Sequence, residues 1–149
     1  MKHEDETIKM TGSVLVEIFD EKTGEIKDRR EIHNLVVSVG KTFIASRMVG
    51  AVSPVMSHMA VGAGNTAVAV GDTALASELG RVALSDLTSS GAVVTHAASF
   101  PAGTGTGAVV EAGVFNASSS GTLQCRTVFA VVNKGVDDAM AITWTVTVS

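Results

Sequence analysis

Charged side chains are scarce over most of this chain, and that scarcity constrains its function more than any motif does. Fifteen of them fall within the first 34 residues, whereas only eleven are spread over the remaining 115. A globular domain usually has about a quarter of its residues charged, and these charges keep it soluble and unassociated. A body this neutral is typical of a protein that works packed against copies of itself or against a partner.

Other absences exclude further classes of protein. The single cysteine, Cys125, excludes an internal disulfide and a cysteine-based zinc site, and we expect it to be a small buried residue in a strand. A net charge of −4 without a basic stripe argues against nucleic-acid binding. No apolar run is long enough to span a bilayer, and the charged N-terminus is unlike a secretory signal. These features fit synthesis in a reducing cytoplasm.

Catalytic and cofactor motifs are incomplete in this sequence. Gly40-Lys41-Thr42 resembles the end of a phosphate-binding loop, but Leu35 occupies the position of the first glycine. The segment 62–67 (GAGNTA) lacks the third glycine and the surrounding βαβ unit of a dinucleotide site. The four histidines are scattered without metal-ligand spacing, and no nucleophile elbow is present. We therefore expect no enzyme activity, no cofactor and no metal. A small hydrolase is the least favoured functional interpretation.

The local patterns predict one domain built mainly of strands. Residues 1–11 have no periodicity and are expected to form an extended N-terminal arm, followed by a single domain over 12–149. Segments 12–20 and 25–34, joined by a glycine-containing turn, predict a hairpin. Apolar residues at i, i+4 spacing predict one helix over about 39–49, and 74–80 could form one or two helical turns.

The remaining strands are predicted at 58–62, 81–87, 92–100, 109–116, 123–132 and 139–148. Glycine-rich turns separate them, at 89–91 among other places. The last strand alternates Thr143, Thr145 and Thr147 with Ile142, Trp144 and Val146, which indicates one buried face. Short strands with glycine-marked turns favour an all-β fold, an antiparallel β-sandwich of jelly-roll-like form.

Four charged residues stand alone among apolar neighbours: Glu78, Arg81, Glu111 and Arg126. An unpaired buried charge costs about 3–5 kcal/mol, so such residues are paired within the fold or lie at an interface. We expect Glu111 to pair with Arg81 or with Arg126. The leading interpretation is a structural ion pair, and the alternatives are an intersubunit pair and a catalytic carboxylate.

Several segments, read in order, resemble a family of small bacteriophage virion proteins. They are 31–37 (EIHNLVV), 39–47 (VGKTFIASR), 58–64 (HMAVGAG), 71–81 (GDTALASELGR), 111–116 (EAGVFN), 125–129 (CRTVF), 133–134 (NK) and 142–144 (ITW). The resemblance covers about residues 12–148, and its specificity comes from the order and spacing of these segments. Such proteins are similar to capsid cement or decoration proteins, and many are described as tail-fibre-like.

The resemblance implies a jelly-roll-like sandwich on the exterior of an icosahedral capsid, made in the host cytoplasm. Its expected partners are the major capsid protein and sister copies of itself, as a dimer or a trimer, with no nucleic acid and no membrane. The expected contact elements are residues 1–12, the hairpin tip around residues 22–24 and the loop 63–73. Their expected contact residues are Met1, Lys2, His3, Glu4, Lys9, Lys22, Gly24, Asn65 and Val68.

A tail or head-fibre component is the alternative interpretation, including an adhesin that binds host sugar. It would share the strand-rich body of small residues. Sugar sites usually present exposed aromatic rings for stacking, whereas this chain has one tryptophan and no tyrosine. That scarcity of aromatic residues disfavours the sugar-binding form of the alternative.

Overall fold

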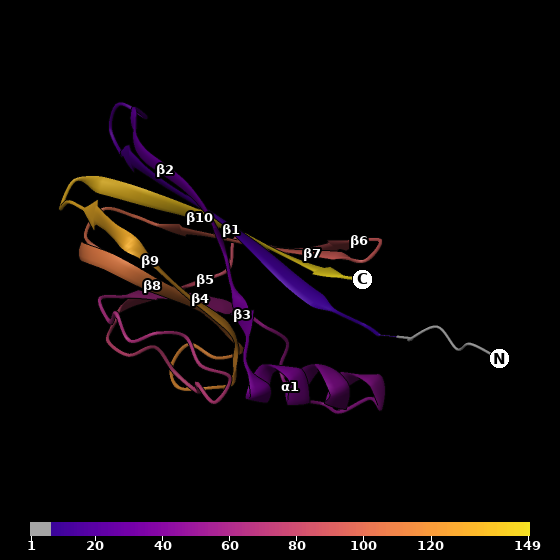
Figure 1. Cartoon of the computed structure of the whole chain (residues 1–149). Coiled ribbons are helices and arrows are strands. Elements are labelled where there is room, and N and C mark those ends of the chain that lie inside the picture. Colours follow the sequence, from indigo (N-terminus) through magenta and orange to yellow (C-terminus); the bar gives the residue numbers. More distant parts are fainter. Residues whose placement is uncertain (1–6) are drawn as a thin grey trace.

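A computed structural model describes residues 7–149 as two antiparallel sheets packed face to face (Figure 1). Sheet A has the strand order β2-β1-β10-β7-β6, and sheet B has the order β3-β9-β8-β4-β5. Sheet A contains β1 (Met10–Asp20), β2 (Ile26–His33), β6 (Asp86–Ser90), β7 (Val93–Phe100) and β10 (Asp138–Val148). Sheet B contains β3 (Leu35–Val36), β4 (His58–Gly62), β5 (Glu78–Ala83), β8 (Gly107–Phe115) and β9 (Leu123–Lys134). The helix α1 spans Ser38–Met48.

The expected all-β antiparallel sandwich with one short helix is confirmed. Strands from the two ends of the chain pair with each other, as β1 does with β10, β3 with β9 and β4 with β8. This nested pairing is a jelly-roll-like feature. The core between the sheets is formed by apolar residues that alternate along each strand, among them Val14, Val16, Ile142, Trp144 and Val146 of sheet A. Cys125 lies in the same core and is buried, as expected.

The outer face of sheet B carries a second, smaller core. The loop between β4 and β5 and the start of α1 lie on the side of sheet B that is away from sheet A (Figure 1). Leu75 of that loop and Val39 of α1 pack against the buried residues Ala60, Phe115 and Leu123. Residues 7–149 therefore form three layers, with sheet A as one outer layer and the loop and α1 as the other.

Gly40 sets how closely α1 approaches sheet B. A methyl group at this position would meet the backbone of Gln124, whose carbonyl oxygen would lie 2.1 Å from the added carbon. Because backbone atoms cannot swing aside as a side chain can, the helix must move outward. We expect Gly40→Ala to lower the free energy of unfolding by about 1–3 kcal/mol, the usual range for overpacking.

Urea denaturation followed by circular dichroism measures this loss. Gly71→Ala is the matched control, because an added methyl group there has no neighbour within 4 Å and the backbone is not in the left-handed region. Equal stability of the two variants would mean that α1 does not depend on close contact with β9.

The structure corrects several element boundaries. Residues 9–11 belong to the sheet instead of the arm, since Lys9 exchanges backbone hydrogen bonds with Ser149 at 2.7 and 2.8 Å and β1 begins at Met10. Residues 1–6 of the expected arm lie outside the described residues. The turn predicted at 89–91 is shorter, because Ser89 and Ser90 pair with β7 and the left-handed residue is Gly91.

The strand predicted over 81–87 is in fact two strands in different sheets. The chain turns a corner at Leu84 and Ser85, where the N–H of Leu84 donates to the carbonyl of Ser57 and that of Ser85 to the carbonyl of Ala97 in β7. The helical turns considered for 74–80 are also wrong. The N–H groups of Ala76 and Ser77 donate to the carboxylate of Glu111 instead of to helical carbonyls, and β5 begins at Glu78.

Candidate functional site

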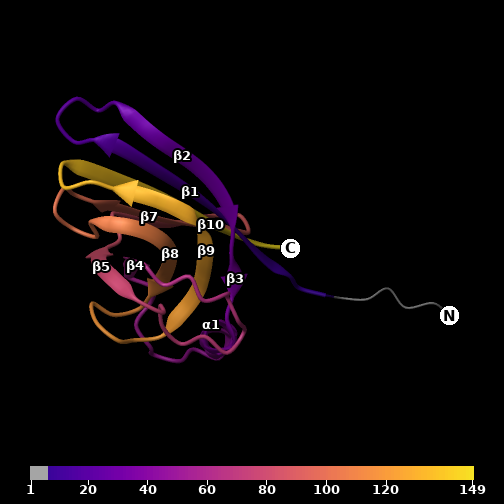
Figure 2. The same ribbon diagram turned by 60° about the vertical axis from the view of Figure 1, so that its left-hand side comes forward.

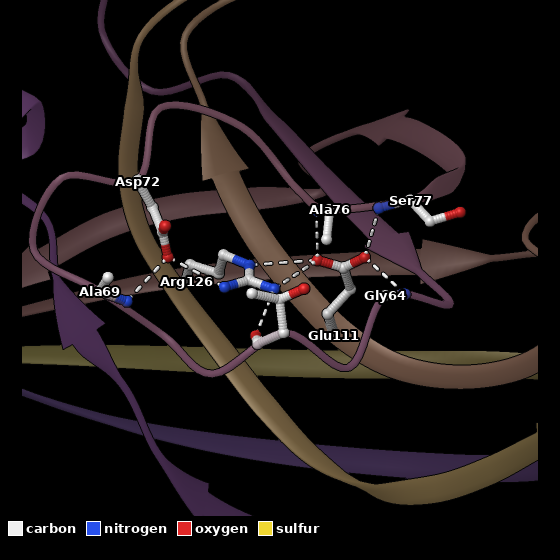
Figure 3. Close-up of polar contacts among 8 residues, drawn as sticks. Gly64, Ala69, Asp72, Ala76, Ser77, Glu111 and Arg126 are labelled. Atoms are coloured by element: carbon white, nitrogen blue, oxygen red, sulfur yellow. Dashed lines mark hydrogen bonds and ion pairs between the residues drawn. The ribbon is translucent and has the colours of Figure 1, made fainter.

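A buried ionic network joins β8 and β9 to the loop between β4 and β5 (Figure 3). Glu111 of β8 is 0% exposed and Arg126 of β9 is 1% exposed. The guanidinium donates from Nε and Nη2 to Oε1 of the carboxylate, at 3.1 and 3.0 Å. Of the two arginines that the sequence offered as partners for Glu111, the structure selects Arg126.

The carboxylate of Glu111 also holds the loop backbone. Its Oε2 accepts hydrogen bonds from the N–H groups of Gly64 and Ser77, at 2.7 and 2.8 Å, and its Oε1 accepts one from Ala76 at 2.8 Å. Both ends of the loop are thereby tied to one side chain. Gly64 is required at this contact, because a methyl group there would lie 2.5 Å from Oε2. With five donors around it, the carboxylate has no acceptor site free for proton transfer, and its role is structural.

Arg126 extends the network to the middle of the loop. Its Nη1 donates to Oδ2 of Asp72 at 2.9 Å, and its Nη2 donates to the carbonyl of Thr66 at 3.0 Å. The same oxygen of Asp72 accepts the N–H of Ala69 at 3.0 Å. Asp72 was not among the expected pairing residues, although its place in a loop of uncharged residues was a usable signal. The network fixes the loop at its two ends and at its centre (Figure 3).

Arg81 pairs with Glu78 instead of with Glu111. Its Nη2 lies 2.6 Å from Oε1 of Glu78, and its Nη1 donates to the carbonyls of Ala117 and Ser120 at 3.0 and 2.9 Å. The guanidinium stacks on the ring of Phe115, 3.8 Å from its centroid. These contacts fasten the loop between β8 and β9 against β5, so all four isolated charges stabilise the loops around sheet B.

The expected contact residues lie at separate places on the molecule. Lys9 is exposed where β1 begins, whereas Lys22 and Gly24 are exposed at the hairpin tip, at the opposite end of β1. Asn65 is exposed and Val68 half-buried in the loop on the outer face of sheet B. The expected contacts Met1, Lys2, His3 and Glu4 lie outside the described residues. The structure therefore does not gather these residues into one patch.

The hairpin tip is a defined turn. Oδ1 of Asp20 accepts the N–H groups of Lys22 and Thr23, at 2.9 and 2.8 Å, and Gly24 has the expected positive φ, at 75°. β2 of this hairpin is an edge strand of sheet A, and the hairpin tip lies far from the start of β1 (Figure 2).

An ion pair ties this hairpin to β10, because Nζ of Lys27 lies 2.7 Å from Oδ1 of Asp138. This hydrogen bond and one from the N–H of Gly135 lower the pKa of Asp138 below its ordinary value of 3.8. A carboxyl group with a depressed folded pKa stabilises the fold above its unfolded pKa, and this contribution is lost as the pH falls through the folded pKa. We expect Lys27→Met to move the titration midpoint of Asp138 upward.

Carboxyl carbon NMR titration measures that midpoint directly. The stability difference between the wild type and Lys27→Met should also narrow as the pH falls from 3.8 through the lower folded pKa of Asp138, because this carboxyl group is neutral in both proteins only below that folded pKa. An unchanged midpoint in the variant would show that Lys27 does not govern this carboxyl group.

The body of the molecule uses most of its few charges internally. From residue 35 onward, seven of the eleven charged side chains are buried or take part in the ion pairs described above: Asp72, Glu78, Arg81, Glu111, Arg126, Lys134 and Asp138. The others are Lys41, Arg47, Asp86 and Asp137. Apolar side chains are exposed on the same body, including Met48 at 83%, Val52 at 98% and Val136 at 72%. Its surface is therefore nearly free of uncompensated charge.

Among residues 7–149, no three histidine, cysteine or acidic side chains form a group that could hold a metal ion. The described part of the chain also contains no helix that is long and apolar enough to cross a membrane. Comparison of the chain with protein-family models, with curated proteins and with solved structures gave no match.

Proposed function

We propose that this protein is a bacteriophage capsid decoration protein, which binds the outer surface of an icosahedral shell and bridges neighbouring major capsid protein subunits. The observation that carries the proposal is the distribution of charge. The body buries or pairs most of its charged side chains and exposes apolar ones, such as Val49 and Val52. A surface of this kind loses little free energy of hydration when a partner covers it, and interface cores are depleted of charge for that reason.

The placement of the expected contacts also supports a bridging role. Lys9 and Lys22 lie beyond opposite ends of β1, which is 11 residues long and therefore about 35 Å at roughly 3.3 Å per residue. Contacts separated by this distance can engage two neighbouring subunits of a shell. Many copies on a symmetric surface would strengthen each weak contact through avidity.

The proposal is tested by mixing the purified protein with phage heads (assembled capsids) that lack it and then sedimenting these heads. We expect the protein to sediment with the heads in a saturable manner. Protein that stays in the supernatant at every concentration would contradict the proposal. An elongated homotrimer in solution that joins only tails would favour the fibre component instead.

Charge-reversal variants test the two ends of the hairpin separately. Lys9→Glu and Lys22→Glu should each lower the occupancy of heads without changing stability, because both side chains are exposed. Asp86→Lys is the control, a charge reversal at an exposed residue of β6, the edge strand of sheet A opposite the hairpin. Equal occupancy for all three variants would remove Lys9 and Lys22 from the capsid interface.

A further inference from the structure

A pocket of about 290 Å³ opens at the end of the sandwich where the β6–β7 hairpin faces α1 and the start of β9. Phe43 of α1, Met56 and Val94 of β7 form apolar walls. Val55 and Leu87 are 49% and 40% exposed and stand at its rim. For comparison, an apolar cavity of about 150 Å³ in another protein holds one benzene molecule. The pocket therefore has room for a compound with a single ring.

Four polar side chains line this pocket: Thr88 and Ser89 are exposed, whereas Gln124 and His96 are buried. Gln124 of β9 is 7% exposed, and its Oε1 has no hydrogen-bond partner. His96 of β7 is 1% exposed, and its Nδ1 lies 3.3 Å from the carbonyl oxygen of Trp144. Burying a polar group without a partner costs about 1–3 kcal/mol. Gln124 and His96 thus bring an amide group and an imidazole ring to the wall of the pocket.

The protonation of His96 follows from its surroundings. A carbonyl oxygen only accepts hydrogen bonds, so Nδ1 carries the proton that it shares with Trp144. Burial lowers the pKa of His96, which keeps the ring neutral. In a neutral ring with a protonated Nδ1, Nε2 is an acceptor. Nε2 of His96 thus favours a ligand that donates a hydrogen bond, whereas Oε1 of Gln124 is sealed from the pocket.

We propose that this pocket binds a small neutral molecule with one hydroxyl group on a compact apolar body, such as a phenol or a cyclic alcohol. The ring would contact Phe43, Met56 and Val94, and the hydroxyl would donate to Nε2 of His96 and accept from an N–H of the Gln124 amide. A cation does not fit, because the walls offer it no carboxylate. The inference stands apart from the capsid proposal, since none of the expected capsid contacts lines the pocket.

The test titrates the full chain with p-cresol and, in parallel, with toluene, which has the same ring and methyl group but no hydroxyl. Binding is followed by NMR of the Met56 methyl group and of the His96 ring nitrogens. We expect saturable binding of p-cresol that is roughly tenfold tighter than that of toluene, because toluene leaves Nε2 of His96 and the amide N–H of Gln124 unpaired. We also expect the Nε2 resonance to shift with p-cresol only.

Two variants locate the preference in the named side chains. Gln124→Met and His96→Leu should each reduce the advantage of p-cresol over toluene, whereas His33→Leu, at an exposed histidine of β2, should preserve it. Equal affinities of the wild type for the two compounds would overturn the proposal without any variant. So would shifts that rise linearly with p-cresol and never saturate, which would mark an adventitious additive only.

Discussion

Replacing Arg126 with methionine is expected to lower the free energy of unfolding by about 3–5 kcal/mol, the cost of leaving a buried charge without its partner. Glu111 would keep its three backbone donors but lose the guanidinium, at a site where its side chain is 0% exposed. Asp72 and the carbonyl of Thr66 would lose the same partner. The change therefore removes the contacts of Arg126 with the centre of the loop. It also destabilises the site of Glu111, which binds the two ends of the loop.

Urea denaturation followed by the fluorescence of Trp144, the only tryptophan of the chain, measures the loss. Arg29→Met is the matched control, because this arginine is 66% exposed and lies 3.8 Å from Glu17; an exposed pair of this kind contributes about 0–1 kcal/mol. Similar losses for the two variants would contradict a network that depends on burial.

A second substitution separates the charge from the hydrogen bonds. Adding Glu111→Gln to Arg126→Met removes the unpaired charge and keeps one amide oxygen for the N–H groups of Gly64 and Ser77, although the amide nitrogen in place of Oε1 cannot accept from Ala76. We expect the double variant to be less destabilised than the sum of the two single variants, as is usual for groups in one network. Hydrogen exchange at Gly64, Ala76 and Ser77 should be faster in Arg126→Met. Unchanged exchange at these amides would mean that the loop is held by other contacts.

Trp144→Ala is expected to cost a further large amount, about 3–5 kcal/mol, the range for removing a large aromatic side chain from a core. Trp144 is the largest fully buried side chain, and it lies in β10 between Val14 of β1 and His96 of β7. Its removal leaves a cavity where the two sheets meet. Circular dichroism is the appropriate probe, since this variant has no tryptophan.

Trp144→Phe is expected to cost much less than Trp144→Ala. Phenylalanine fills part of the volume, and it also removes Nε1, a buried donor without a hydrogen-bond partner. The gain from removing that group, about 1–3 kcal/mol, offsets part of the lost contact. A phenylalanine variant as unstable as the alanine variant would show that Nε1 is hydrogen-bonded in solution.

The strands of this protein could be predicted wherever one face is buried and the other is not. The alternation along 139–148 locates β10, and the glycine turn before residue 25 locates the first hairpin. The helix was predictable because α1 keeps apolar residues such as Phe43 and Ile44 on the side that packs against the core. These features depend on local periodicity, which a single sequence records.

The other features of the fold and of the ionic network depend on contacts between residues that are distant in the sequence. Local periodicity contains no information about such contacts. The corner at Leu84 and Ser85 arises because the first N–H donates to Ser57, just before β4 of sheet B, and the second donates to Ala97 in β7 of sheet A. The segment 74–80 is short and apolar enough for a helix, but Glu111 captures its N–H groups. The isolated charges pointed correctly to ion pairs, whereas the choice of Arg126 over Arg81 and the participation of Asp72 required the three-dimensional arrangement.

The buried ion pairs of sheet B connect the fold to the proposed function. Because Glu111, Arg126 and Asp72 hold the loop from within, the loop presents exposed uncharged residues such as Asn65 in a fixed conformation. A fixed surface loses little conformational entropy when a partner binds. The network therefore serves a binding role by keeping the surface over sheet B preformed.

The measurement that tests the central claim most directly is the number of copies bound to heads that lack the protein, at saturation. The heads are sedimented, and the ratio of this protein to the major capsid protein is determined by quantitative gel densitometry. A decoration protein should saturate at a whole number of copies per symmetry-equivalent position of the shell. No binding, or only a few copies per head, would contradict a role on the capsid surface and would place the protein at the tail.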